Sequence, residues 1–396
     1  MRARLRRASA GFACLLAVLA GCSPPPPARP ELADAGPPVT VTWSVPSGAG
    51  PRWTPVGFDR IPGWKADHPA DALTAFLGSC AQMGAPNQSL GGQGDAAAYG
   101  GTAGQWRTVC AGAAQVPPGD EAARAFFEAR FQPYGVSTDG SAEGLYTGYY
   151  EPEFAGSRAP TGGYKYPIYR RPPGLSAGKN RAPYFSRAEI SHGALRGKRL
   201  ELLWLSDPID AFFLEIQGSG RIRLPDGKIV RVTYDGQNGH QYVAIGRVLV
   251  DRGEMALPDV TMQSIRAWLD AHPDQAQEVM NKNPAFVFFR EVPSLSADAG
   301  PPGAHGAQLT PRRSIAVDRT FVPLGAPVFI VTHDPVTGAN FQQLMVAQDV
   351  GGAIRGAVRA DIFWGWGPDA EERAGKMRRQ GIEFLLLPKP DVTASR

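Results

Sequence analysis

The sequence predicts a mainly β protein that contains a few helices. Its 396 residues include 47 glycines and 37 prolines, which interrupt the chain so often that the segments between them are short. Several of these segments are rich in β-branched or aromatic residues and are bounded by turn residues, which is typical of strands. A chain of this length is also long enough to form two domains, each with its own hydrophobic core.

Residues 1–21 predict an export signal, because four arginines in residues 1–7 precede an apolar run of about ten residues. The sequence Leu19-Ala20-Gly21-Cys22 resembles the lipobox of bacterial lipoproteins, in which the cysteine is acylated and becomes the first mature residue. A serine after this cysteine favours the outer membrane over the inner one. The alternative is an ordinary cleaved signal with an incidental cysteine. No other segment has the ~18 uninterrupted apolar residues that a membrane-spanning helix needs.

Behind the signal, residues 22–46 are rich in proline and predict an extended tether. Residues 70–83 and 119–131 predict helices, the second because apolar residues recur at helical spacing after an acidic first turn. Residues 244–252 and 261–272 predict two further helices. The predicted strands are residues 145–150, 212–217, 229–234, 285–289, 327–331 and 343–347.

The cysteines also indicate an oxidising compartment. Cys14 falls in the signal and Cys22 is the predicted lipid site, so Cys80 and Cys110 remain as one pair. In an exported protein we expect these two to form a disulfide that closes a loop of about thirty residues. Two free buried thiols are the alternative.

Composition excludes several classes of function. The net charge of +4 is small, and the basic residues are spread along the chain with no base-stacking motif, so no nucleic-acid partner is predicted. The six histidines include no His-x-x-x-His pair and the cysteines lack metal-ligand spacing, so no metal site is predicted. The sequence has neither the Gly-x-Ser-x-Gly elbow of serine hydrolases nor a phosphate-binding loop, and no cofactor is expected.

Two aspartates near the C-terminus, Asp349 and Asp361, point to acid–base chemistry. The glycines between and after them leave open space beside an acid that points inward. The apolar residues 362–364 follow Asp361 directly, and apolar surroundings raise the pKa of a carboxyl group toward the range useful for proton donation. Such an acid can protonate a glycosidic oxygen. The alternative is that both aspartates only close turns in a β-rich domain.

Two further clusters combine aromatic, acidic and amide groups. In the first, which ends a predicted strand, Tyr149 offers a ring that can pack on a sugar, and Glu151 and Glu153 form a second carboxylate pair. In the second, Gln217 and Ser219 lie beside glycines that keep side chains away from a ligand. A solvated strand edge and a bulge with a turn are the alternatives for the two clusters.

Taken in this order, the clusters resemble the membrane-bound lytic murein transglycosylase A family. The motifs are residues 147–152 (TGYYEP), 166–169 (YPIY), 212–220 (FFLEIQGSG), 238–242 (NGHQY) and 283–289 (NPAFVFF). Residues 309–366 resemble the family's 3D domain, named for three aspartates that match Asp318, Asp349 and Asp361.

The resemblance implies a double-psi β-barrel domain formed by residues 47–150 and 286–396. A smaller β-barrel domain, residues 151–285, is inserted between these two parts, and a substrate groove runs between the domains. The implied partners are peptidoglycan strands, the membrane through a lipid anchor at Cys22, and cell-wall synthesis proteins. The implied location is the periplasmic face of the outer membrane.

The resemblance also implies cleavage of the β-1,4 bond between N-acetylmuramic acid and N-acetylglucosamine, with a 1,6-anhydro product and no added water. Asp361 matches the catalytic residue, which acts first as acid and then as base. Asp349 is expected either to hydrogen-bond Asp361 or to stabilise positive charge at the anomeric carbon, and Asp318 to be structural. Arg312 stands where the family pattern would have glycine. The expected substrate-binding residues are Tyr149, Gln217, Ser219 and Trp364.

Two other functions remain as alternatives. A non-catalytic peptidoglycan-binding lipoprotein would use the same groove, with the acids serving only the fold. An aspartic-protease-like pair of acids on a β-barrel would need an Asp-Thr-Gly or Asp-Ser-Gly signature, to which Asp349-Val350-Gly351 is the nearest approach.

Overall fold

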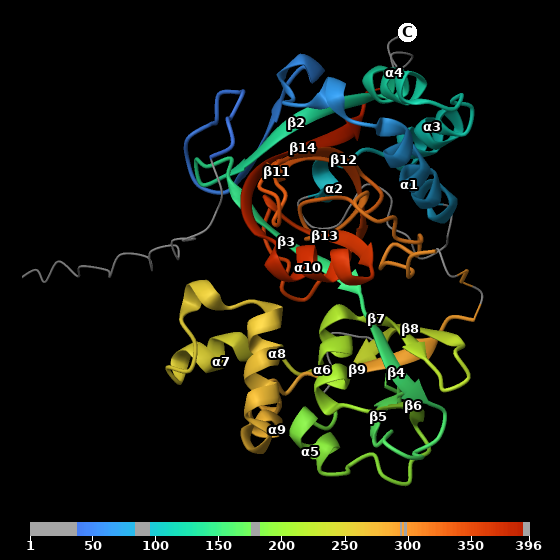
Figure 1. Cartoon of the computed structure of the whole chain (residues 1–396). Helices are drawn as coiled ribbons and strands as arrows, with labels where there is room; N and C mark the ends of the chain where they lie inside the picture. The colour runs from blue at the N-terminus through green and yellow to red at the C-terminus, as the bar shows by residue number, and fades with distance from the viewer. Residues whose placement is uncertain (1–37, 84–95, 176–182, 294, 297–298, 391–396) are drawn as a thin grey trace, which may run out of the picture. The chain divides into compact units, whose positions relative to one another are not determined.

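The computed structural model shows a mixed α/β protein with two β-sheets (Figure 1). It describes residues 38–83, 96–175, 183–293, 295–296 and 299–390. The predicted signal peptide and Cys22 lie outside these residues. Of the helices described, none combines the length and apolar character that crossing a membrane requires.

Eight strands form the first sheet, and six of them close into a ring. The strands are β1 (Pro51–Pro55), β2 (Phe131–Thr138), β3 (Gly144–Glu151), β10 (Ser314–Val317), β11 (Pro327–His333), β12 (Asn340–Asp349), β13 (Arg359–Trp366) and β14 (Arg378–Pro388). Their order is β1-β2-β14-β11-β12-β10-β13-β3, and β14 also pairs with β3. This last pairing closes a six-stranded barrel, from which β2 and β1 extend (Figure 1).

The barrel strands confirm the predictions for residues 145–150, 327–331 and 343–347. Every residue of β11 is buried, and so is the second half of β14. Near-continuous apolar runs of this kind are what strands covered on both faces require.

The second sheet is built from strands that lie between β3 and β10 in the sequence. They are β4 (Glu153–Ser157), β5 (Tyr166–Tyr169), β6 (Glu201–Leu205), β7 (Ser219–Arg223), β8 (Ile229–Gln237) and β9 (Val287–Glu291). Their order is β5-β6-β4-β7-β8-β9, so the pairings of the described residues give an open sheet where a smaller barrel was predicted. The short edge strand β5 contains Pro167, which has no backbone N–H to donate to a further strand.

Helices occupy more of the chain than the sequence predicted. Four of the helices, α1, α4, α7 and α8, confirm the four predicted ones. The α-helices are α1 (Pro69–Gln82), α2 (Ala96–Tyr99), α3 (Ala103–Ala113), α4 (Asp120–Arg130), α5 (Arg187–Ser191), α6 (Pro208–Gln217), α7 (Ile245–Asp251), α8 (Met262–Ala271), α9 (Pro273–Asn281) and α10 (Pro368–Lys376). Short 3-10 turns lie at Phe58–Arg60, Trp64–Ala66 and Leu257–Asp259.

The predicted strand at residues 212–217 is wrong, because these residues form the second half of α6. The Asp207 carboxylate accepts a hydrogen bond from the Ile209 amide at 2.8 Å and caps the helix, and Pro208 occupies its first turn. Gly218 ends the helix at φ +77°, a conformation that favours glycine. The buried residues 209, 212 and 213 have the i, i+3, i+4 spacing of one helix face.

The predicted tether is also wrong at its C-terminal end. Val39, Val41, Trp43 and Val45 are partly buried and pack against the core of the first sheet. Trp43 makes an edge-to-face contact with Phe384 of β14, with ring centroids 5.0 Å apart. The alternation of apolar and polar residues from 39 to 45 is the sequence signal for this packing, and the proline content obscured it.

A buried acid, Glu383 of β14, lies beside Tyr146 of β3. The Tyr146 hydroxyl donates to Oε2 of Glu383 at 2.9 Å, while Oε1 has no hydrogen-bond partner among the described residues. Burial raises the pKa of Glu383 to about 8, against the opposing effect of the Tyr146 hydrogen bond. This carboxyl group is therefore mainly protonated in the folded protein at neutral pH.

Because of Glu383, stability is expected to fall as the pH rises between the unfolded pKa of 4.5 and the folded pKa of about 8. In this window the folded chain holds a proton that the unfolded chain has released, an effect of roughly 5 kcal/mol at most. Glu383→Gln removes the titration. Urea unfolding near each end of the window should therefore show the variant gaining stability relative to the native chain as the pH rises. A difference that stays constant across the window would contradict this.

Candidate active site

A row of paired residues across neighbouring strands brings the two predicted acids near one another. Ala316 of β10 pairs with Asp349 of β12 on one side and with Asp361 of β13 on the other. Asp361 also pairs with Thr147 of β3. Since neighbouring strands lie about 4.8 Å apart, the backbones of the two aspartates are roughly 10 Å apart.

Asp361 is half-buried, and one side chain of the described ranges forms a hydrogen bond with its carboxyl group. The Thr147 hydroxyl donates to Oδ1 of Asp361 at 2.7 Å. Burial raises the pKa of Asp361, whereas the positive charge of Arg359 and the Thr147 hydrogen bond oppose that rise. A half-buried carboxyl group with a raised pKa suits proton donation.

Asp349 accepts more hydrogen bonds than Asp361 does. The backbone amides of Ala304 and Val350 donate to its Oδ1, each at 2.9 Å, and the Tyr149 hydroxyl donates to its Oδ2 at 3.0 Å. Burial raises the pKa of Asp349, these donors lower it, and the charge of Asp361 raises it further. The sequence left two roles open for Asp349. The first, a hydrogen bond to Asp361, is not formed between the described side chains.

Tyr149 contacts Asp349 and is close enough to Asp361 to be affected by its charge. Its ring packs against Phe363 of β13, with centroids 5.3 Å apart, and its hydroxyl meets Asp349. Burial raises the pKa of the Tyr149 phenol well above its usual value, and the charges of both aspartates add to the effect. The phenol therefore keeps its proton and donates it to Asp349 in a hydrogen bond.

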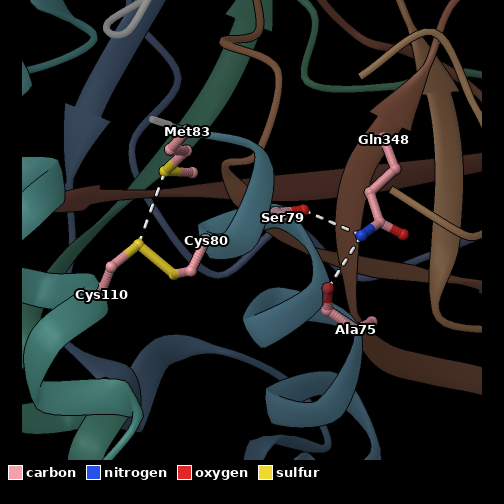
Figure 2. The surroundings of a disulfide bond; sticks show 6 residues. All are labelled: Ala75, Ser79, Cys80, Met83, Cys110 and Gln348. Carbon is pink, nitrogen blue, oxygen red and sulfur yellow. Dashed lines mark hydrogen bonds between the residues drawn. A yellow bond between two sulfur atoms is a disulfide. The ribbon is translucent and has the colours of Figure 1, made fainter. Parts of the chain in front are cut away.

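The residue before Asp349 anchors the end of β12 to helix α1 (Figure 2). Nε2 of Gln348 donates to the Ala75 carbonyl and to the Ser79 hydroxyl, each at 2.8 Å. Its Oε1 accepts a hydrogen bond from Ser314 of β10. Because Gln348 is fully buried, these contacts fix the backbone that carries Asp349.

A disulfide reinforces this anchor. Cys80 of α1 is bonded to Cys110 of α3, so the pair forms a disulfide and the two cysteines are not free thiols (Figure 2). Since α1 supplies both partners of Gln348 Nε2, the disulfide braces the helix on which the anchor depends.

Asp318 has the contacts of a structural acid. It is 5% exposed, and its Oδ1 accepts from the Thr320 amide while its Oδ2 accepts from the Gly356 amide, each at 3.1 Å. The second bond ties the Gly-rich segment between Asp349 and Asp361 to the turn after β10. These contacts support the predicted structural role.

Gln217 and Ser219 lie where α6 passes into β7. Oε1 of Gln217 accepts a hydrogen bond from the Tyr150 amide of β3 at 3.2 Å. Ser219 is buried and pairs with Thr233 of β8. In this structure both residues hold the ends of strands together, and their predicted contact with substrate stays a prediction.

The burial of Trp364 contradicts the prediction that it stacks on a sugar. It is 4% exposed and packs against Phe341, with ring centroids 5.4 Å apart. The guanidinium groups of Arg312 and Arg373 each lie 5.7 Å from its ring centre. Side chains alternate along a strand, so Trp364 faces away from the side that carries Asp361.

Arg312, where the resemblance led us to expect glycine, adopts φ +59°, a left-handed conformation that favours glycine. A residue with a Cβ at such a position costs about 1 kcal/mol. The contacts of its guanidinium with the Phe341 and Trp364 rings offset that cost.

Glu151 is the centre of a buried charged cluster at the end of β3. Its carboxylate accepts hydrogen bonds from Nε of Arg221 at 3.0 Å and from Nη2 of Arg231 at 2.7 Å. The Arg221 guanidinium also lies 4.3 Å from the Trp366 ring centre, and Nη1 of Arg231 donates to the Ser296 carbonyl at 3.1 Å. The cluster thus joins β3, β7, β8 and β13 to the chain that returns after β9.

Sequence reasoning missed Thr147 and Arg359 as members of the site. Thr147 opens the TGYYEP motif, in which nothing local indicates that its hydroxyl contacts an acid. Arg359 lies two residues before Asp361, a spacing that places both on one face of a strand. That spacing was the available signal for Arg359.

No three His, Cys, Asp or Glu side chains within the described ranges are grouped so that they could hold a metal ion.

Comparison with known proteins relates these features to a family. Residues 145–290 match the MltA specific insert domain, and residues 313–387 match the 3D domain. Membrane-bound lytic murein transglycosylase A of Escherichia coli strain K12 is 39% identical over 252 residues, which are 62% of this chain and 66% of the relative. The alignment thus spans about two thirds of that protein's length.

Solved structures agree over a larger share of the chain. MltA from Neisseria gonorrhoeae, in its monoclinic form, is 35% identical with a TM-score of 0.73 and covers 90% of this chain and 97% of its own. Escherichia coli MltA with bound chitohexaose is 33% identical with a TM-score of 0.59, covering 72% and 83% of the two chains. With its MltA insert and its 3D domain, this chain belongs to the membrane-bound lytic murein transglycosylase A family.

Proposed function

We propose that the protein is a lytic transglycosylase that cleaves the β-1,4 bond between N-acetylmuramic acid and N-acetylglucosamine in peptidoglycan and leaves 1,6-anhydromuramyl ends. The observation that carries this proposal is Asp361, a half-buried acid of the 3D domain whose pKa is raised by burial and which Thr147 holds in place. The names of the relatives and the chitohexaose bound to the Escherichia coli homologue support a glycan substrate.

Asp361 acts first as the acid and then as the base. Its proton moves to the glycosidic oxygen while the bond from that oxygen to C1 of the muramic residue breaks. The C6 hydroxyl of the same residue attacks C1 and returns its proton to Asp361. The anhydro ring forms, the acid is regenerated and no water is consumed, whereas ordinary glycosidases use two carboxylates and water.

Asp349 is the anionic partner of Asp361. Among the described residues, three donors meet Asp349, from Tyr149 and two backbone amides, whereas a single hydroxyl meets Asp361. Hydrogen bonds to the charged form favour that form, so of the two acids Asp361 keeps its proton and Asp349 carries the negative charge. This charge stabilises the positive charge that develops at the anomeric carbon.

The proposal also covers the type of barrel, the domain limits and the cellular location. The closed six-stranded ring is a double-psi β-barrel formed by residues 47–150 and 286–396, with residues 151–285 as the insert. Acylation of Cys22 anchors the protein at the periplasmic face of the outer membrane, within reach of peptidoglycan and of cell-wall synthesis proteins. Tyr149, Gln217 and Ser219 remain the proposed substrate contacts.

The competing function is a peptidoglycan-binding lipoprotein without catalysis. Incubation of the full-length chain with purified sacculi separates the two functions. The proposal predicts release of soluble muropeptides that carry anhydro ends. Sedimentation of the protein with intact sacculi, without any release, would favour the binding module and overturn the enzyme.

A further inference from the structure

We infer that Arg359 and Thr147 form a relay that gives the two oxygens of Asp361 different tasks, so that Oδ1 is held and Oδ2 carries the proton. The inference deepens the proposed function and rests on it. In this relay Arg359 and Thr147 are positioning residues for the acid.

Chemistry sets the direction of the hydrogen bond between Arg359 and Thr147, and Thr147 is the donor in its hydrogen bond with Asp361. Nη2 of Arg359 donates to the Thr147 hydroxyl oxygen at 2.9 Å, and that hydroxyl lies 2.7 Å from Oδ1 of Asp361. A guanidinium group can only donate, and a hydroxyl group has one proton. The contact with Arg359 therefore occupies an acceptor position of Thr147 and leaves its proton for Asp361.

Arg359 is itself fixed by backbone contacts. Its Nη1 donates to the carbonyl of Leu145 at 3.2 Å and to that of Ala360. It forms no ion pair with any acid in the described part of the chain, so no other carboxylate neutralises its charge. This charge opposes the effect of burial on the pKa of Asp361.

The remaining oxygen of Asp361 is left for the substrate. Among the described residues, Oδ2 has no hydrogen-bond partner, whereas Oδ1 already accepts from Thr147. A proton on Oδ1 would face the hydroxyl proton of Thr147, so the acid proton is favoured on Oδ2. Once Asp361 has given up this proton, the Thr147 bond and the Arg359 charge stabilise the carboxylate at the step in which it forms.

Removal of the Thr147 hydroxyl tests the relay. Thr147→Val is expected to lower kcat on solubilised peptidoglycan roughly tenfold to a hundredfold with little change in KM. Since the anion of Asp361 loses a donor, the basic limb of the pH profile should move to higher pH. Thr147→Ser should restore both the rate and the profile.

Thr332→Val is the matched control, because the hydroxyl of Thr332 on β11 donates to the Gln380 carbonyl at 2.7 Å and takes no part in the relay. It should leave kcat and the pH profile at native values. Native kinetics in Thr147→Val, or no recovery in Thr147→Ser, would overturn the relay.

Two variants of Arg359 separate its charge from its hydrogen bond. Arg359→Gln keeps a donor for Thr147, whereas Arg359→Met removes both the donor and the charge. Both variants should move the basic limb to higher pH, and only the methionine variant should approach the rate loss of Thr147→Val. Equal rates for the two variants would show that the donor has no role.

A measurement that needs no activity separates failure of the relay from failure of the proposed function. If the native chain releases no muropeptides, the proposed function fails and the kinetic tests no longer apply. The contact is then tested by the unfolding free energies of Thr147→Val, Asp361→Ala and the double variant. Losses of unfolding free energy that do not add up in the double variant support the hydrogen bond between Thr147 and Asp361. Additive losses overturn it.

Discussion

Asp361→Asn is expected to give a folded protein whose release of muropeptides falls at least about a thousandfold. An amide at this position can still accept the Thr147 hydrogen bond, so the strand pairing around it should survive. It cannot protonate the glycosidic oxygen or take up the proton of the C6 hydroxyl. Both halves of the proposed reaction are therefore lost together. The rate is measured from soluble fragments released by purified sacculi.

Asp369→Asn serves as the control for this substitution. Asp369 is an exposed residue in the first turn of α10 that pairs with Arg373, and it lies outside the proposed site. Its amide variant should release muropeptides at the native rate. Native turnover in Asp361→Asn would show that another group supplies the proton.

Glu151→Gln is expected to cost roughly 3 kcal/mol of unfolding free energy, because it removes the charge of a buried carboxylate that two buried guanidinium groups share. Glu151 is 1% exposed, while Arg221 and Arg231 are 7% and 6% exposed. Their guanidinium groups cannot release a proton to escape the loss of the carboxylate. Urea unfolding of the native and variant chains measures the cost.

Glu153→Gln is the matched control two residues away. Glu153 is exposed and accepts from Nε of Arg223 at 2.7 Å, so its ion pair is in contact with water. An exposed pair contributes about 1 kcal/mol or less. Equal losses in the two variants would contradict the view that burial of the cluster makes Glu151 important.

The sequence predicted three of the six barrel strands, β3, β11 and β12, because these have clear local patterns. The runs at 327–331 and 343–347 are apolar, short and bounded by turn residues. The aromatic run at 212–217 misled the prediction, since a short apolar run does not distinguish a strand from a buried helix. The signals for a helix at α6 were its capping residues, Asp207 at the start and Gly218 at the end.

The site was only partly predictable for a different reason. Asp349 and Asp361 stand out because each lies beside glycines or an apolar run. Their partners come from strand register, which no local pattern reveals: Thr147 lies 214 positions before Asp361, and Tyr149 lies 200 positions before Asp349. The burial of Trp364 also depends on which face of β13 meets the core.

In the proposed reaction the muramic sugar cyclises on itself while Asp361 carries the proton. The most direct test is digestion of purified sacculi by the full-length chain in water enriched in heavy oxygen, followed by mass analysis of the fragments. We expect muramyl ends that are one water lighter than hydrolytic ends and that contain no heavy oxygen. Reducing ends labelled with heavy oxygen would contradict it.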